Sequence, residues 1–95
     1  MRFNLQRIQY IEEKANEALL AVKTNINVLM ELKDYYNSVM QSEDCPQDLR
    51  QHSKASYARF GTRVGSVQHD LRLQQSKLET LLRLLTNRKT LVRLF

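Results

Sequence analysis

Apolar residues recur at steps of three and four along the first part of the chain. The row comprises Leu5, Ile8, Ile11, Ala15, Leu19, Val22, Ile26, Leu29, Tyr36 and Met40, with one step taken by Lys33. This spacing is typical of an amphipathic helix and predicts one over about residues 3–41. A second row lies beside it and consists of Ala18, Ala21, Val28, Leu32, Tyr35 and Val39. The two rows cover roughly half of the circumference, so we expect this helix to contact two neighbours.

The second part of the chain carries a seven-residue apolar repeat, formed by Leu71, Leu78, Leu85 and Val92. Further apolar residues continue the alternating steps of three and four, namely Tyr57, Phe60, Val64, Val67, Leu81 and Phe95. Gln74 and Arg88 take two of the seam positions. This pattern is typical of a coiled coil and predicts a helix over about residues 46–94. A flanking row of Leu73, Leu84 and Leu91 is again wider than the contact between two helices requires.

Polar residues and the single proline interrupt both patterns at about residues 42–45, where we expect the loop. Asp44 or Cys45 is predicted to cap the second helix, with Pro46 in its first turn. So short a loop favours antiparallel packing, and counting from it places the residues after about Arg88 beyond the start of the first helix. This overhang ends in apolar residues, so we expect the chain to be excised from a longer protein.

The fold predicted from these patterns is all-α, a single domain over residues 1–95 built as an antiparallel two-helix hairpin or coiled coil. We expect it to self-associate into a helical bundle, most simply as a dimer, because its apolar stripes exceed one helix contact. The predicted interface comprises Val22, Ile26, Leu29, Leu32, Leu71, Leu73, Gln74, Leu78, Leu81, Leu84, Leu85, Leu91 and Val92.

Composition narrows the class of protein. The chain is 42% hydrophobic and 26% charged, which argues against disorder and against a lipid-embedded chain. Cys45 is the only cysteine, so no intramolecular disulfide can form and a reducing compartment is the simpler expectation. The start of the chain lacks the features of a signal peptide. We therefore expect a cytoplasmic protein, with the cytosolic face of a membrane as the alternative location.

Basic charge is concentrated in the second half, where residues 59–95 carry a net charge of +6. An anionic membrane surface is the alternative partner, through Arg88, Lys89, Leu91, Arg93, Leu94 and Phe95, because basic and apolar residues alternate there. Nucleic acid is disfavoured, since the basic residues spread around the helix instead of forming one stripe.

No group of residues carries a recognisable chemistry. His52, His69 and Cys45 do not supply the patterned ligands of a zinc site. His69 and Asp70 are adjacent, so their side chains point about 100° apart on a helix, and no patterned nucleophile accompanies them. Glu12, Glu13 and Glu17 offer oxygen ligands for Mg²⁺, although a solvated polar face explains them better. The prediction is a non-enzymatic protein without a cofactor.

Two segments resemble a known family. Residues 7–20 (RIQYIEEKANEALL) and 73–89 (LQQSKLETLLRLLTNRK) are similar to the helical region of fungal CorA-like magnesium-transporter domain proteins. The resemblance implies a cytosolic coiled-coil stalk, which in that family precedes two membrane-spanning helices and assembles into rings. The family's Gly-Met-Asn tripeptide and membrane helices do not occur in these 95 residues, so it implies a stalk or scaffold segment rather than transport.

The predicted function is therefore a coiled-coil assembly or stalk module that mediates oligomerisation. The alternative is a peripheral module that contacts an anionic membrane surface through its basic and apolar C-terminal end. A third reading is a helical adaptor whose apolar groove receives a helix of another protein. Helices of the parent protein are a further expected partner beside a second copy of the chain.

Overall fold

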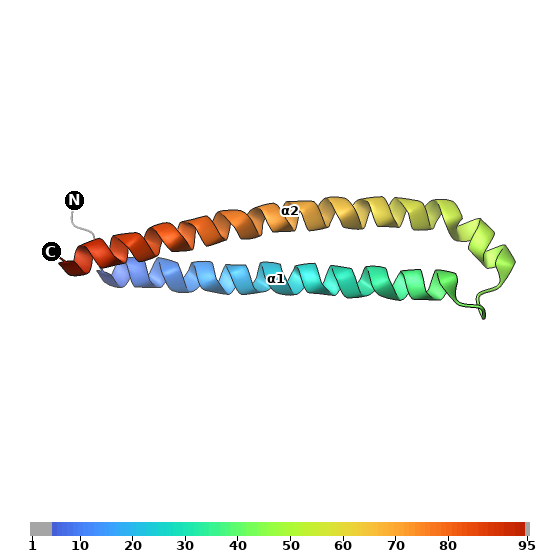
Figure 1. Ribbon diagram of the computed structural model, residues 1–95, viewed down its shortest axis with the longest axis horizontal. Coiled ribbons are helices and arrows are strands. Elements are labelled where there is room, and N and C mark those ends of the chain that lie inside the picture. Colours follow the sequence, from blue (N-terminus) through green and yellow to red (C-terminus); the bar gives the residue numbers. More distant parts are fainter. Residues whose placement is uncertain (1–4, 95) are drawn as a thin grey trace.

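Two long antiparallel helices make up the structure, a computed structural model that describes residues 5–94 (Figure 1). Helix α1 spans Leu5–Gln41 and helix α2 spans Gln47–Leu94, and the described residues contain no strand. The hairpin measures 70 × 18 × 14 Å. The predicted all-α hairpin is thus confirmed, with helix boundaries within a residue or two of the expected ones. Residues 3 and 4, predicted to be helical, lie outside the described residues.

Ser42 organises the loop between the helices. Its backbone carbonyl accepts hydrogen bonds from the Cys45 amide at 3.1 Å and from Nη2 of Arg50 at 2.7 Å. Its hydroxyl accepts a third from the Asp44 amide at 3.2 Å. These bonds satisfy the orphan carbonyl after the last turn of α1 and tie the first turn of α2 to it.

The cap of α2 lies one or two residues later than predicted. The carbonyl of Pro46 accepts the hydrogen bond of the Arg50 amide at 3.0 Å, which is the first bond of the helix. Pro46 therefore takes the cap position expected for Asp44 or Cys45, because it has no N–H to leave unpaired there. Asp48 lies in the first turn, as expected, near the positive end of the helix dipole.

The predicted C-terminal overhang is shorter than expected. Helix α2 has 48 residues against 37 in α1 and extends past α1 at both ends, with its first turns beyond the end of α1 and its last turn beyond the first described residues of α1 (Figure 1). Two contacts show the register: the rings of Tyr36 and Phe60 are 4.7 Å apart, and Nζ of Lys89 lies 2.8 Å from Oε1 of Glu12. The residues directly after Arg88 therefore run beside the start of α1, and only the end of α2 projects past it. The prediction failed because it assumed a tight turn, whereas the loop carries the chain outward before α2 begins.

A single narrow seam holds the helices together. In α1 the residues with the least exposure are Ile8, Ala15, Val22 and Ile26, and in α2 they are Val64 and Gln68. The row continues through half-buried side chains, which are Leu5, Glu12, Leu19, Leu29, Leu71, Gln75, Leu78, Leu82, Leu85, Lys89 and Val92. We call these residues the hairpin seam. Its steps alternate between three and four, as in coiled coils.

The seam follows the predicted heptad but differs at the positions between its leucines. Leu71, Leu78, Leu85 and Val92 lie on it as predicted, whereas Gln74, expected there, is exposed. The seam passes instead through the residue after each expected one, so that Gln68, Gln75, Leu82 and Lys89 replace Val67, Gln74, Leu81 and Arg88. In α1, Glu12 similarly replaces Ile11. This rotation brings Glu12 and Lys89 together, and a carboxylate leaving water needs such a partner.

The two glycines of α2 offer a direct test of helix regularity. A Cβ atom added at Gly65 meets nothing within 4 Å, and the residue is exposed and helical. We expect Gly65→Ala to raise the free energy of unfolding by about 0.5–1 kcal/mol, because alanine loses less backbone entropy in a helix. Thermal unfolding followed by circular dichroism measures the change. A lower melting temperature would contradict an uninterrupted helix at this point.

Candidate helix-binding surface

A second row of mainly apolar side chains runs beside the hairpin seam, for most of its length one residue before each seam position. Its apolar members in α1 are Ile11, Ala18, Ala21, Val28, Leu32, Tyr35 and Val39, and in α2 they are Phe60, Val67, Leu81, Leu84 and Leu91. The same rows also contain Asn25, Gln74 and the charged residues Arg7, Lys14, Arg63, Asp70, Lys77 and Arg88. We call the set of apolar members the apolar face. All of its members except the half-buried Phe60 are exposed. Its largest exposed fractions include 64% at Tyr35 and 55% at Leu91.

Both rows of the apolar face lie on the same side of the hairpin. One step back along a helix turns a side chain by about 100°. Because the helices are antiparallel, a step back along each chain turns both side chains toward the same side. The cavity at the loop end agrees with this geometry, since Val39 from α1 and Ser56 and Phe60 from α2 line it together.

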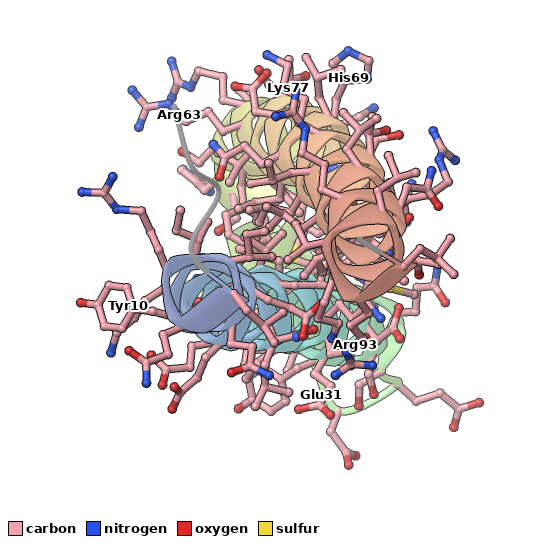
Figure 2. The ribbon with its side chains drawn as sticks, turned by 90° about the vertical axis from the view of Figure 1, so that its left-hand side faces the viewer. Tyr10, Glu31, Arg63, His69, Lys77 and Arg93 are labelled. Carbon is pink, nitrogen blue, oxygen red and sulfur yellow. The ribbon has the colours of Figure 1, made fainter. Side chains whose placement is uncertain are left out.

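The opposite side of the hairpin is polar. It carries the residues that follow the seam positions, among them Glu13, Asn16, Lys23, Asn27, Asp34, His69, Arg72, Ser76, Glu79, Arg83, Thr86, Thr90 and Arg93. Leu20 and Met30 are the large apolar residues of this row. In Figure 2, Arg63 lies on one side of α2 and His69 lies on the other. The hairpin therefore has one mainly apolar face, on which Arg63 also lies, and one mainly polar face.

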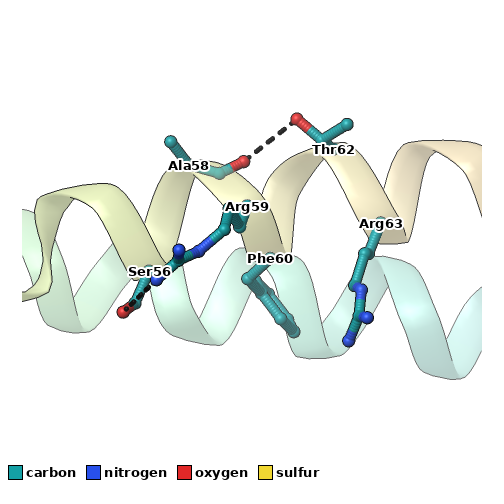
Figure 3. A pocket seen from close by; sticks show the side chains of 6 residues that line it. All are labelled: Ser56, Ala58, Arg59, Phe60, Thr62 and Arg63. Carbon is teal, nitrogen blue, oxygen red and sulfur yellow. Dashed lines mark hydrogen bonds between the residues drawn. The ribbon is translucent and has the colours of Figure 1, made fainter.

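Figure 3 shows the same division at closer range, in a hollow beside α2. Phe60 and Arg63, which precede seam positions, point one way, and Thr62, which follows one, points the other. The hydroxyl of Thr62 donates to the carbonyl of Ala58 at 3.1 Å. Arg59 donates to Oγ of Ser56 at 3.3 Å. These polar groups are bonded locally within α2.

An apolar cavity of about 370 Å³ ends the apolar face near the loop. It lies between the last turns of α1 and the first turns of α2, and its lining consists of Tyr36, Val39, Met40, Cys45, Leu49, Ser53, Ser56, Tyr57 and Phe60. The cavity exists because α2 begins beyond α1 and bends back over it (Figure 1). Tyr36 and Phe60 line the cavity together, and the planes of their rings are tilted by 53° relative to each other.

At the other end of the hairpin, Glu12 and Lys89 form an ion pair on the seam. The side chains of both residues are 20% exposed, and the two atoms lie 2.8 Å apart. The pair Lys14–Glu17 differs, with a distance of 3.5 Å and side chains that are more than half exposed. The partly buried pair is the stronger determinant of register, because removing one partner leaves a charge away from water.

The structure divides the residues predicted for the interface into two groups. Leu71, Leu78, Leu85 and Val92 lie on the hairpin seam with Val22, Ile26 and Leu29, and are used within one chain. Leu32, Gln74, Leu81, Leu84 and Leu91 lie on the apolar face and are exposed. Leu73 is also exposed but lies two residues after Leu71, which places it about 160–200° from the seam. Leu73 is thus separated from Leu84 and Leu91, with which the sequence pattern grouped it, and the assignment of all these residues to an interface between chains stays a prediction.

The residues predicted for membrane contact are likewise separated. Lys89 is engaged by Glu12, and Leu91 belongs to the apolar face. Leu94 is 73% exposed, and Arg93 is exposed on the polar side. Phe95 lies outside the described residues. Because the long overhang expected after Arg88 does not form, the residues predicted for membrane contact do not make up a separate projecting segment.

Residues 5–94 contain neither a cluster of metal ligands nor a membrane-spanning helix. Nowhere in this range do three or more His, Cys, Asp or Glu side chains come together as metal ligands, and Glu12 of the acidic group bonds Lys89. Neither described helix is apolar enough over sufficient length to cross a membrane. The apolar face is therefore the most distinctive surface of the described chain.

Comparison of the chain with protein-family models, with curated proteins and with solved structures found no match. The resemblance to CorA-like proteins therefore stays a prediction. The class defined by the fold is an antiparallel helical hairpin of the coiled-coil type.

We expect Lys89→Met to lower the free energy of unfolding by about 1–2 kcal/mol, because Glu12 is then left partly buried without a partner. Replacing both residues, Glu12→Leu with Lys89→Met, should restore stability. Chemical denaturation measures both changes. The matched control is Lys14→Met, which breaks the exposed pair and should change stability by less than about 0.5 kcal/mol. Equal losses for Lys14→Met and Lys89→Met would contradict the role given to the seam pair.

Proposed function

We propose that the hairpin is a non-enzymatic assembly module that acts by self-association through its apolar face, most simply as a dimer. The observation that carries the proposal is the unequal distribution of exposed apolar residues between the two sides of the seam. On both helices the row before the seam is mainly apolar, with charged residues such as Arg63 and Lys77 between its apolar members, whereas Leu20 and Met30 are the large apolar residues of the row after it. Apolar surface gathered on one side marks an interaction site more than scattered residues do.

The exposed area supports this proposal. The hairpin exposes 7855 Å², whereas a compact monomer of the same mass would expose about 5,700 Å². The difference, roughly 2,000 Å² per chain, falls within the range that permanent homodimers bury. A partner along the apolar face would supply the burial that two helices alone do not reach.

The thin core supports it as well. The buried apolar residues in the described chain are only Ile8, Ala15, Val22, Ile26 and Val64, spread over a structure 70 Å long. Small domains with so little core commonly gain stability from oligomerisation. The proposed role is therefore structural, and a stalk of the kind that the CorA-like resemblance implies would use the same face.

A pair of charge substitutions tests the proposal. We expect Val28→Glu with Leu84→Glu to weaken self-association at least 100-fold, because each carboxylate would have to be desolvated in the contact. Light scattering after size-exclusion chromatography would then give the mass of one chain at concentrations where the unmodified protein is a dimer.

The matched control is Leu20→Glu with Met30→Glu, which introduces the same two charges on the polar face at residues that are 67% and 43% exposed. It should leave the dimer intact. Dissociation of this control to the same extent, or an unmodified protein that is already a monomer, would contradict the proposal. A monomer that captures a helix of a different protein would favour the adaptor reading instead.

A further inference from the structure

We infer that the second copy packs on the apolar face with its loop at the same end, so that α1 of each chain lies against α2 of the other. This inference rests on the proposed self-association and adds its topology. The result is a four-helix bundle in which every neighbouring pair of helices is antiparallel, with the two-fold axis along the length of the hairpin.

The hairpin's own register determines which residues would meet. A two-fold axis along the hairpin keeps every residue at its level, so residues that lie level within one chain would also lie level across the contact. The Glu12–Lys89 and Tyr36–Phe60 contacts give these levels at the two ends. Counting along the helices from both contacts places Ala18 and Ala21 of one chain within about one turn of Leu81 and Leu84 of the other.

The apolar side chains brought together in this way are complementary in size. The two alanines of α1 lie level with two leucines of α2, and an alternation of small and large residues favours interdigitated packing. Toward the loop, Leu32 lies level with Val67, and Val39 lies level with Phe60, again within about one turn. In the middle, the amides of Asn25 and Gln74 lie level with each other.

Charge favours the same topology. Helix α2 contains ten basic and three acidic residues, whereas α1 contains four basic and five acidic ones. A two-fold axis across the hairpin would lay α2 of one copy on α2 of the other, which places net charges of +7 side by side. With loops at the same end, α2 instead faces α1 of the second copy, whose net charge is −1, and the two basic helices lie diagonally.

The single cysteine permits a direct measurement of orientation. Cys45 lies in the loop, at one end of the hairpin. Spin labels on Cys45 of both copies should lie about 15–40 Å apart if the loops share one end, because helices pack at 8–10 Å and the labels add their tethers. Loops at opposite ends of hairpins 70 Å long would place them beyond about 50 Å. Pulsed electron paramagnetic resonance measures this distance.

Each outcome has a separate meaning. A distance within the shorter range supports the inference. A dimer with the longer distance overturns the topology but leaves the proposed self-association standing, and the absence of any dimer overturns both. Because Cys45 is half-buried, the same measurement with Glu43→Cys in a Cys45→Ser background provides an exposed label at the same end. Disagreement between the two label sites would also overturn the inference.

Discussion

The apolar stripe on each helix is wider than the contact that two helices make, and the other features of the structure follow from this mismatch. The hairpin seam, with its alternating steps of three and four, includes only the residues of each helix that face the other helix of the same chain. The row one residue earlier on both helices stays in water, and antiparallel packing brings its two halves to one side. The thin core, the large exposed area and the proposed partner are consequences of the same geometry.

The rotation of each helix about its axis decides which residues the seam takes. Residues 81 and 82 are both leucine, so burying an apolar side chain at this level of α2 does not by itself determine how the helix is rotated. The charged pair does distinguish the two possibilities, because Glu12 and Lys89 meet only when the seam passes through them. Placing this pair on the seam keeps Ile11, Leu81 and Leu84 outside, so a partly buried ion pair within the hairpin also determines what the apolar face contains.

The helices, the loop and the seven-residue repeat could be predicted from the sequence, because proline, polar residues and leucine spacing act locally. The register could not, since it depends on how far the loop carries the chain before α2 begins. Nothing in the polar residues 42–45 indicated that the carbonyl of Ser42 would bind both Cys45 and Arg50. The pattern assigns Gln74 to the seam because it lies three residues after Leu71 and four before Leu78. Gln75, four residues after Leu71 and three before Leu78, has the same side chain, and only the neighbouring helix distinguishes the two positions.

The central claim is that a second copy covers the apolar face. Sedimentation equilibrium of the unmodified chain from about 1 to 100 µM, a range that spans common dimer affinities, tests it most directly. The account predicts a mass that rises toward twice the chain mass of 11.2 kDa, with helical content increasing in parallel. A fully helical species that keeps the mass of one chain over the whole range would contradict it.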